Sequence, residues 1–193
     1  MSSPLAIAPD RFIAFPWKNG QGVTMDIAAA HREGGRPGDW ETVLWRFGRT
    51  GIGKPGPFSD MAGFERLQVV VEGRGLRLRA ADGSEIDVRT PFVPVRFDGA
   101  TKIDSVLDEG PVEVVNLIVR RDFAAGGLLV APAGTATILV PGAHVVYAPE
   151  GELSLVLDAT AHTVPAGHSL RFEGSAAFRI SAGRAVIATI APK

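Results

Sequence analysis

The fold is decided by one stretch, Pro57–Leu76, which reads PFSDMAGFERLQVVVEGRGL. Its second half predicts a β-strand, because β-branched residues follow one another in Val69-Val70-Val71. The glycines on either side of Arg74 then permit a tight turn, and Leu76-Arg77-Leu78 predicts the strand that leaves it. A loop rich in proline and glycine leads into the first of these strands. The stretch therefore predicts a hairpin, in which two paired strands are joined by the glycine turn.

Short apolar runs separated by turns recur along the whole chain. Its 193 residues include 23 Gly and 14 Pro, spread evenly instead of clustered. Such frequent turns favour an all-β protein, either a sandwich or a barrel, and no stretch of helical length shows a convincing helical period. The clearest strand is Val112–Arg120, whose period of two puts Val112, Val114, Asn116, Ile118 and Arg120 on one face.

The composition excludes several classes of function. With 46% hydrophobic residues, 21% charged residues and a net charge of −1, the chain is predicted to be a soluble protein that neither nucleic acid nor anionic membranes attract. The absence of cysteine excludes disulfides, thiolate metal sites and cysteine nucleophiles. No apolar run reaches the ~18–20 residues of a membrane-spanning helix, and Met1–Asp10 lacks the features of a signal peptide. We therefore expect a cytoplasmic protein without nucleic-acid or membrane partners.

Metal binding and covalent catalysis find little support in the sequence. The four histidines are His31, His144, His162 and His168. His162 and His168 could meet across a hairpin, but zinc and iron sites need three or more converging ligands. The chain has no Gly-x-Ser-x-Gly motif to hold a serine nucleophile. We predict no metal, no cofactor and no catalytic residue.

The segment Pro16–Thr24 brings an aromatic ring, a cation and an amide to one turn. Trp17, Lys18 and Asn19 precede two glycines around a polar residue, and glycine permits close approach of the backbone. The segment is either a plain loop between edge strands or a loop that contacts a ligand. The residues alone leave both readings open.

Two predicted strands place polar side chains among apolar neighbours. Arg46 lies between Trp45 and Phe47, so its stem is expected to pack against aromatic rings. Asn116 lies among valines and an isoleucine, where a buried amide needs hydrogen-bond partners. It either locks two strands together or contacts a ligand, and both readings stay open.

The second half of the chain repeats the pattern of strands and turns. Residues 122–127 contain Ala124-Ala125-Gly126-Gly127 and are predicted to be a flexible linker. From Leu128 onward, short strands are predicted near 136–140, 144–148, 153–157, 169–173, 176–181 and 184–190. We therefore divide the chain into a larger N-terminal region, 1–121, and a smaller C-terminal region, 128–193.

Several segments together resemble the HutD/Ves family, and they match it in order and spacing over nearly the whole chain. The most specific is Pro16–Thr24, and the next runs from Phe58-Ser59 to Gly63-Phe64-Glu65-Arg66. The others are Trp45-Arg46, Gly56-Pro57 and Asn116-Leu117 with Arg120. The resemblance implies a bicupin, that is, two fused cupin-like β-barrels at 1–121 and 128–193, without a metal in the usual place.

The resemblance also bears on what the first barrel holds. In a metal-binding cupin, the first hairpin of the barrel would carry a His-x-His pair of ligands. This chain has no histidine between Arg32 and Ala143, and the corresponding strand offers Glu65, Arg66 and Gln68. The pocket of the first barrel is therefore expected to hold an anion rather than a transition metal.

The predicted ligand-binding residues are Trp17, Lys18, Asn19, Arg46, Arg66, Gln68, Asn116 and Arg120. The four cations lie on separate segments that one barrel could bring together, and arginine binds a carboxylate through two parallel hydrogen bonds. The amides would bind an amide or formyl group, and the tryptophan would form a wall. The alternative for each arginine is a local partner, such as Glu65 or Glu72, or a stem that packs while its head stays in water.

The resemblance implies a link to bacterial histidine utilisation or stress response. A role proposed in that family is to bind a pathway intermediate such as N-formylglutamate, as a regulator or a governor of flux. From the residues, we weigh a non-catalytic protein that binds a small carboxylate against a metal-independent isomerase or hydrolase acting on a small organic acid. The lack of an obvious general base favours the first. An interaction module and a homodimer are further readings that the sequence leaves open.

Overall fold

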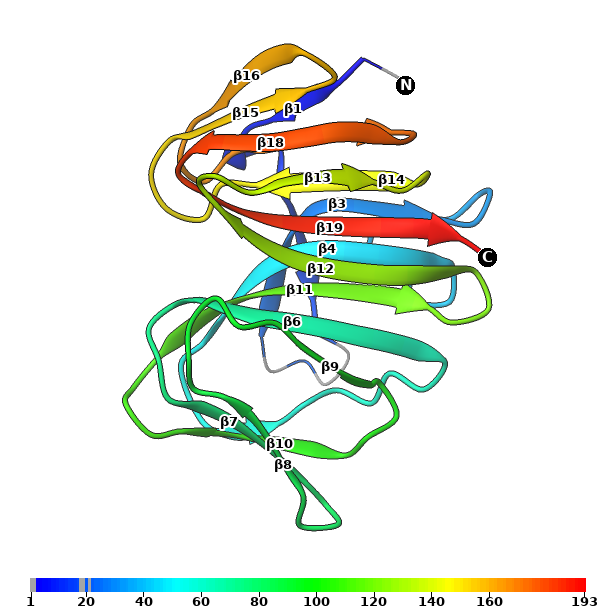
Figure 1. The fold of residues 1–193 in the computed structure, drawn as a ribbon. Helices are drawn as coiled ribbons and strands as arrows, with labels where there is room; N and C mark the ends of the chain where they lie inside the picture. Colours follow the sequence, from blue (N-terminus) through cyan, green and yellow to red (C-terminus); the bar gives the residue numbers. More distant parts are fainter. Residues whose placement is uncertain (1–2, 18–19, 21) are drawn as a thin grey trace. The chain divides into compact units, whose positions relative to one another are not determined.

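The computed structural model describes residues 3–17, 20 and 22–193. The chain divides into two compact units: the first is Ile13–Phe123, and the second joins Ala124–Lys193 to the chain that precedes Ile13. In the described part, both units are built from antiparallel β-strands, with one 3₁₀ turn, η1 (Pro9–Arg11) (Figure 1). The prediction of an all-β protein is confirmed. No helix among the described residues is long and apolar enough to cross a membrane.

The first unit contains a large sheet and a small sheet. The large sheet has the order β2-β3-β4-β11-β6-β9, with β2 Ile13–Pro16, β3 Val23–His31, β4 Val43–Ile52, β11 Val112–Arg120, β6 Phe64–Glu72 and β9 Val95–Asp98. The small sheet has the order β5-β10-β7-β8, with β5 Gly56–Pro57, β10 Ile103–Leu107, β7 Leu76–Ala80 and β8 Glu85–Val88. The two sheets share no strand pairing among the described residues, so the unit is a pair of sheets and not one closed barrel.

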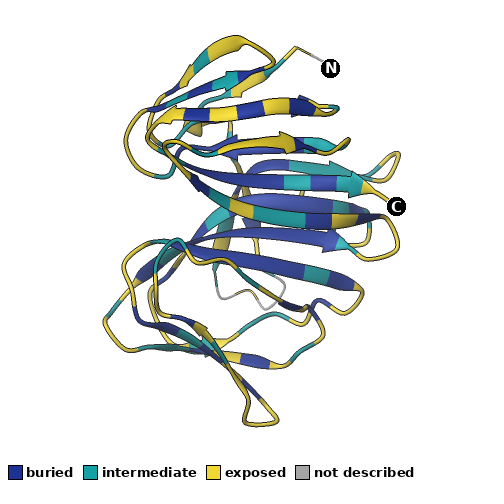
Figure 2. Cartoon of the chain, viewed as in Figure 1, coloured by how far each residue is buried: buried dark blue, intermediate teal, exposed yellow. Residues whose placement is uncertain are grey.

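Strand β11 lies in the middle of the large sheet, with β4 on one side and β6 on the other (Figure 1). From Val112 to Val119, every residue except Glu113 is buried (Figure 2). Both faces of this strand are therefore covered, which explains its nearly unbroken run of β-branched and aliphatic residues. The strand that the sequence predicts most clearly is the centre of the sheet.

The glycine turn at Gly73 and Gly75 passes from one sheet to the other instead of closing a hairpin. Strand β6 pairs with β11 and β9, whereas β7 pairs with β10 and β8. The two glycines have φ angles of 74° and 84°, and a Cβ on Gly73 would lie 2.5 Å from the carbonyl oxygen of Pro111. Only glycine fits this crossing. The sequence prediction is correct in its strands and wrong in pairing them with each other.

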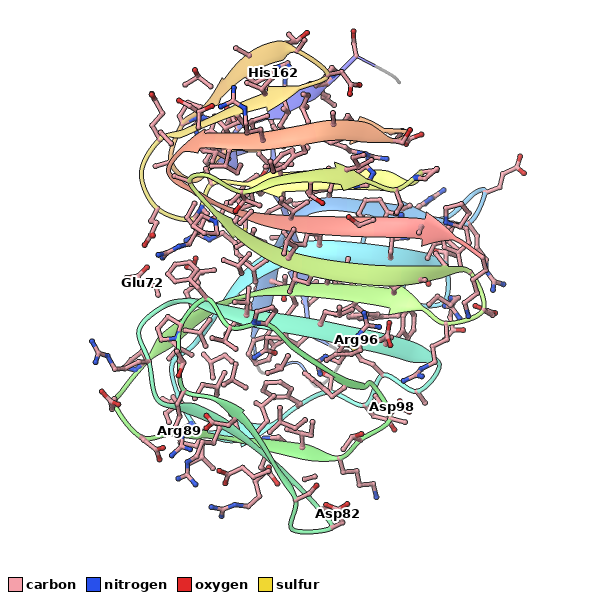
Figure 3. The ribbon with its side chains drawn as sticks, in the orientation of Figure 1. Glu72, Asp82, Arg89, Arg96, Asp98 and His162 are labelled. Atoms are coloured by element: carbon pink, nitrogen blue, oxygen red, sulfur yellow. The ribbon has the colours of Figure 1, made fainter. Side chains whose placement is uncertain are left out.

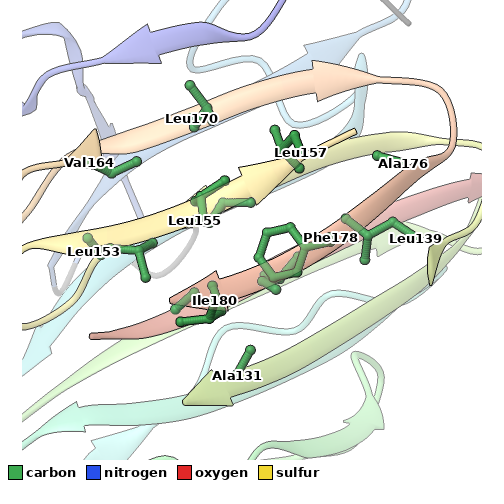
Figure 4. Packing of buried hydrophobic residues seen from close by; sticks show 14 of the residues in the cluster. Ala131, Leu139, Leu153, Leu155, Leu157, Val164, Leu170, Ala176, Phe178 and Ile180 are labelled. Atoms are coloured by element: carbon green, nitrogen blue, oxygen red, sulfur yellow. The ribbon is translucent and has the colours of Figure 1, made fainter. Parts of the chain in front are cut away.

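The second unit also contains two sheets. One has the order β1-β17-β14-β19-β12, with β1 Leu5–Ile7, β17 Ser169–Glu173, β14 Ala143–Tyr147, β19 Arg184–Pro192 and β12 Ala124–Pro132. The other has the order β13-β18-β15-β16, with β13 Ala136–Leu139, β18 Ala176–Ala182, β15 Leu153–Leu157 and β16 Thr160–Val164. Aliphatic and aromatic side chains such as Leu155, Phe178 and Ile180 form the core between them (Figure 4).

The structure corrects the predicted boundaries in two places. Residues 124–127, predicted to be part of the linker 122–127, belong to β12, which pairs with β19 along its whole length. Strand β1, predicted to lie in the first barrel (1–121), pairs with β17 and belongs to the second unit. Both errors have the same cause. Pairing with a distant strand decides these segments, and their local composition carries no signal for it.

Candidate functional site

A cavity lies in the first unit, where the large sheet meets the chain that leads from β5 to β6. Its lining consists of Trp17, Thr24, Asp26, Trp40, Arg46, Gly48, Thr50, Ile52, Phe58, Ser59, Met61, Arg66, Gln68, Val114, Asn116 and Ile118. It leaves about 50 Å³ for the centres of water-sized molecules, and one water molecule needs about 10–15 Å³ on that scale. The enclosed space therefore suits a group of only a few non-hydrogen atoms.

Two apolar clusters bound this cavity. Ile52 and Val114 belong to the cluster that joins the large sheet to β7 and β10. Met61 and Ile118 belong to a second cluster, which includes Phe15. The polar part of the lining is thus set between two hydrophobic cores, where water screens charges weakly.

The register of the large sheet arranges the polar lining in two rows. One row, across β3, β4, β11 and β6, is Asp26, Gly48, Asn116 and Gln68. The next row, across β4, β11 and β6, is Arg46, Ile118 and Arg66. Residues two apart on a strand share a face, so both rows face the cavity.

Arg46 and Asp26 form a buried ion pair. Nε of Arg46 donates hydrogen bonds of 3.1 and 2.8 Å to the two carboxylate oxygens of Asp26, and Nη2 donates one of 2.7 Å. The guanidinium carbon lies 3.4 Å from the centre of the Phe15 ring and 4.6 Å from that of Trp40. Burial raises the pKa of Asp26, while the hydrogen bonds and charge of Arg46 act in the opposite direction. Both charges of the pair are thus satisfied within the protein.

The guanidinium of Arg66 has no such partner among residues 3–17, 20 and 22–193. The residue is 7% exposed, and its Nε is buried without a hydrogen-bond partner among the described residues. The rings of Phe58 and Phe97 lie 4.7 and 5.1 Å from its guanidinium carbon. Burial lowers the pKa of Arg66 to about 10, because the charge has left water without a compensating anion. This cation is electrostatically unsatisfied.

Two amides beside Arg66 are also unsatisfied. Gln68 is fully buried, and neither its Oε1 nor its Nε2 has a hydrogen-bond partner in the described part of the chain. The same holds for Oδ1 of Asn116, the residue directly opposite Gln68 on β11. A buried polar atom without a partner costs roughly 1–3 kcal/mol, and such atoms are rare in folded proteins. Oδ1 of Asn116 therefore does not lock two strands together, and the three side chains present free donors and acceptors to one place.

Two glycines make room for the side chains of the site. A Cβ on Gly48 would lie 3.0 Å from Oδ1 of Asp26 and 2.7 Å from the carbonyl oxygen of Met25. A Cβ on Gly22 would lie 2.9 Å from the indole of Trp17, whose Nε1 donates a hydrogen bond of 3.1 Å to Oγ1 of Thr24. The first glycine admits the buried carboxylate, and the second lets the indole lie against the backbone.

Five of the predicted ligand-binding residues line the cavity: Trp17, Arg46, Arg66, Gln68 and Asn116. Two others, Lys18 and Asn19, lie outside the described residues. The alternative that Arg66 pairs with a local glutamate does not apply to Glu65, which forms an ion pair with Arg96 at 2.6 Å. Sequence reasoning thus found both arginines and both amides of the described lining.

Arg120 is not part of the cavity lining, although it was predicted to bind the ligand. Its guanidinium donates hydrogen bonds to the backbone carbonyl oxygens of Val43, Glu41 and Trp40, at 2.8, 3.0 and 3.3 Å. It also lies 4.6 Å from the centre of the Phe64 ring. Arg120 shares a strand face with Asn116, but its side chain holds the loop before β4 in place.

Sequence reasoning missed Asp26, Trp40, Phe58 and Ser59, which also line the cavity. The most important of these is Asp26, because its carboxylate neutralises the charge of Arg46. Its signal was a carboxylate next to the apolar run Ile27-Ala28-Ala29-Ala30, because a buried carboxylate needs a cation.

The charged groups of the described lining are Asp26, Arg46 and Arg66, which leave one positive charge in excess. The charged side chains labelled on the first unit in Figure 3, such as Asp82 and Arg89, are exposed instead. No group of three or more histidine, aspartate or glutamate side chains able to hold a metal ion occurs among the described residues. The arrangement can bind an anion at Arg66 and a neutral polar group at Gln68 and Asn116.

Comparison with known proteins places these features in a family. The model of the HutD family matches residues 10–189. An uncharacterised 21.2 kDa protein from the hutC 3′ region of Pseudomonas putida is 30% identical over 138 residues, which are 67% of this chain and 70% of that protein.

Solved structures show the same fold. A conserved protein of unknown function from Pseudomonas aeruginosa PAO1 matches with a TM-score of 0.84 and 24% identity, over 98% of this chain and 100% of that one. HutD from Pseudomonas fluorescens SBW25, solved in a formate condition, matches with a TM-score of 0.80 and 22% identity, over 99% and 100%. Salicylate 1,2-dioxygenase from Pseudaminobacter salicylatoxidans shares the fold at a TM-score of 0.59 and 9% identity, over 88% and 76%. The predicted cupin-like fold is confirmed.

Proposed function

Because this chain belongs to the HutD family, which is linked to histidine utilisation, we propose that it is a non-catalytic protein that binds a small carboxylate metabolite in the cavity of its first unit. The observation that carries the proposal is the buried guanidinium of Arg66, which has no anionic partner in the described part of the chain and lies beside two amides that are unsatisfied there. The proposed role is regulation or control of flux. The candidate ligands are N-formylglutamate and other intermediates of histidine degradation.

A carboxylate suits Arg66 better than a neutral ligand does. Arginine keeps its charge at neutral pH, and its planar fork matches the two oxygens of a carboxylate. An anion at this place would supply the charge that burial has left uncompensated. The cavity has room for a carboxylate group and a few further atoms. A larger ligand such as N-formylglutamate would keep the rest of its atoms, including its second carboxylate, outside the cavity.

The amides of Gln68 and Asn116 favour a ligand that also carries a neutral polar group. Nε2 of Gln68 can donate two hydrogen bonds to a ligand. Oε1 of Gln68 and Oδ1 of Asn116 can accept hydrogen bonds from it. An amide or formyl group next to the carboxylate would satisfy atoms that have no partner among the described residues. This complementarity is the reason to include formyl and amide acids among the ligands tested.

Binding without turnover is favoured by the state of Asp26. It is the carboxylate of the described lining, and Arg46 donates to both of its oxygens. A general base must be able to take a proton from its substrate. Both oxygens of this carboxylate already accept hydrogen bonds from Arg46. Asp26 is therefore suited to hold a charge and unsuited to move a proton.

A thermal-shift screen with formate, N-formylglutamate and related carboxylates tests the proposal. A ligand present at 100 times its dissociation constant should stabilise the fold by about 2.7 kcal/mol. Titration calorimetry of the best ligand should show that Arg66→Ala weakens binding about 10- to 150-fold, because a charge-assisted hydrogen bond is lost. Arg66→Lys should restore only part of the affinity, since one ammonium cannot replace the fork.

Arg79→Ala is the matched control, because it removes an exposed arginine of the same unit that lies outside the cavity lining. It should leave both affinity and melting temperature unchanged. A carboxylate that binds wild type and Arg66→Ala equally well would show that the site is elsewhere. Conversion of the ligand, seen as new signals in its NMR spectrum, would favour the enzyme over the binding protein.

A further inference from the structure

Asp26 and Arg46 cancel each other's charge inside the cavity. Three hydrogen bonds of 2.7–3.1 Å join them, and the Phe15 ring stacks on the guanidinium at 3.4 Å. The Nε and Nη2 edge of Arg46 therefore faces Asp26 and is not available to a ligand. Arg66 remains as the cation of the described lining that can receive an anion.

The position of Asp26 also affects the part of the cavity that Gln68 and Asn116 line. In its row across the sheet, Gly48 is the residue between Asp26 and Asn116. Glycine has no side chain, and the carboxylate of Asp26 reaches over it: its Oδ1 lies 3.0 Å from the place of a Cβ on Gly48, beside Cγ2 of Thr24 at 2.7 Å. An anionic group bound at the amides would thus lie near Asp26, in surroundings that screen charge weakly.

We propose that Asp26 makes the cavity selective for singly charged ligands: one carboxylate is bound at Arg66, and a second one at the amides is rejected. This inference rests on the proposed function, since it names the charge class of the ligand at the same site. The group preferred at Gln68 and Asn116 is a neutral one with both a donor and an acceptor. A ligand with two carboxylates would have to hold the second outside the cavity.

Oxamate and oxalate form the matched pair of probes. They have the same number of non-hydrogen atoms, and they differ in that oxamate carries an amide where oxalate carries its second carboxylate. At about pH 7.5 both carboxyl groups of oxalate are ionised, because carboxyl pKa values lie near 4. Titration calorimetry of the full-length wild-type protein should give oxamate an affinity at least about tenfold higher than oxalate.

Three variants test the role of Asp26. Asp26→Asn frees the charge of Arg46, so the preference for oxamate should fall at least about tenfold or reverse. Arg46→Gln leaves Asp26 as an uncompensated anion, so oxamate binding should weaken by about tenfold or more. The double variant Asp26→Asn with Arg46→Gln restores the net charge of the wild-type lining, so oxamate binding should recover to within about threefold of wild type. Circular dichroism melts establish that each variant is folded.

The outcomes separate this inference from the proposed function. Equal affinities for the two probes, or an unchanged ratio in Asp26→Asn, would overturn the selectivity while carboxylate binding stands. If Asp26→Asn does not fold, the other two variants decide, because a double variant as weak as Arg46→Gln would mean that Arg46 contacts the ligand directly. If neither probe binds even at tens of millimolar, the inference is wrong, and the carboxylate screen described above then decides the proposed function separately.

Discussion

The two units treat their buried titratable side chains differently. In the second unit, His144 is fully buried, and its Nε2 lies 3.0 and 2.9 Å from the carbonyl oxygens of Val140 and Gly174. Its Nδ1 lies 3.1 Å from Oγ1 of Thr189. Two carbonyl acceptors require a proton on Nε2, and burial lowers the pKa of His144, which favours the neutral tautomer that accepts at Nδ1. Every hydrogen-bonding atom of this ring has a partner within the protein.

In the first unit, Arg66 is also buried, but the described residues offer it neither an anion nor a hydrogen bond at Nε. The amide atoms of Gln68 on β6 and Oδ1 of Asn116 on the neighbouring strand β11 also lack hydrogen-bond partners among the described residues. The difference teaches how to tell two kinds of buried polar group apart. A satisfied group stabilises the fold and should be costly to remove, whereas an unsatisfied group destabilises it and, in our proposal, is retained for a ligand.

The largest expected effect is at the ion pair of the first unit. Arg46→Met should lower the free energy of unfolding by about 3–5 kcal/mol, because it leaves Asp26 buried without a cation. Urea unfolding followed by circular dichroism measures this. The control is the double variant Asp26→Leu with Arg46→Met, which removes both charges and should recover most of the loss. A single variant as stable as wild type would mean that the pair contributes nothing.

The next effect concerns the satisfied histidine of the second unit. His144→Phe keeps a ring to stack on Phe172 but removes the partners of two carbonyls and one hydroxyl. Its free energy of unfolding should fall by about 1–3 kcal/mol. His162, which is only partly buried, is the control: exchanged for Phe in the same way, it should have a smaller effect in the same urea titration. Equal effects of the two substitutions would remove the distinction between the fully buried, hydrogen-bonded histidine and a partly exposed one.

A smaller effect of opposite sign is expected at Arg66. Arg66→Met keeps an apolar stem between Phe58 and Phe97 while removing an uncompensated charge. The ligand-free variant should be as stable as wild type, or more stable by up to about 2 kcal/mol. The measurement is urea unfolding of protein from which small anions have been dialysed. A loss of more than about 1 kcal/mol would show that Arg66 is a structural residue, contrary to our account.

The smallest effect is a pH dependence from His144. Burial lowers the pKa of His144 below 6.5, so at acid pH the unfolded state binds a proton that the native state does not. Stability due to this group is therefore complete above pH 6.5 and is lost as pH falls below that value, by at most about 1.4 kcal/mol per pH unit. Unfolding titrations at several pH values should show a shallower decline for His144→Phe than for wild type. Parallel declines would contradict the neutral, hydrogen-bonded state of the ring.

Much of the fold could be predicted because its strands carry local signals. Val112–Arg120 is apolar on both faces and is the central strand β11, and the turns marked by glycine and proline separate strands where expected. The pairing of strands was beyond local reasoning. The crossing at Gly73 and Gly75 has the composition of a hairpin turn, and the Ala-Gly run 124–127 has that of a linker. Each takes its structure from a distant strand, β11 and β10 in one case and β19 in the other.

The candidate site could be predicted as far as charge and residue type allow. Asn116 stood out because a polar side chain in an apolar strand needs partners. Arg66 and Gln68 stood out because they lie on the strand that would carry the metal ligands in a metal-binding cupin. Which arginine already has a partner within the protein could not be predicted, since that depends on how the strands pair. Arg46 meets Asp26 across β3 and β4, and Arg120 meets the carbonyl oxygens before β4, whereas Arg66 meets neither. Three arginines of similar appearance in sequence thus have three different states in the structure.

The central claim is that Arg66, and not the neighbouring Arg46, receives the carboxylate. The most direct test is an NMR titration of protein labelled with ¹⁵N-arginine, in which the Nε–H signals are assigned by the signals lost in Arg66→Met and Arg46→Met. On addition of oxamate or the best carboxylate of the screen, our account predicts a large shift of the Arg66 signal and little change at Arg46, whose Nε already donates to Asp26. A ligand that binds while the Arg66 signal stays in place would contradict it.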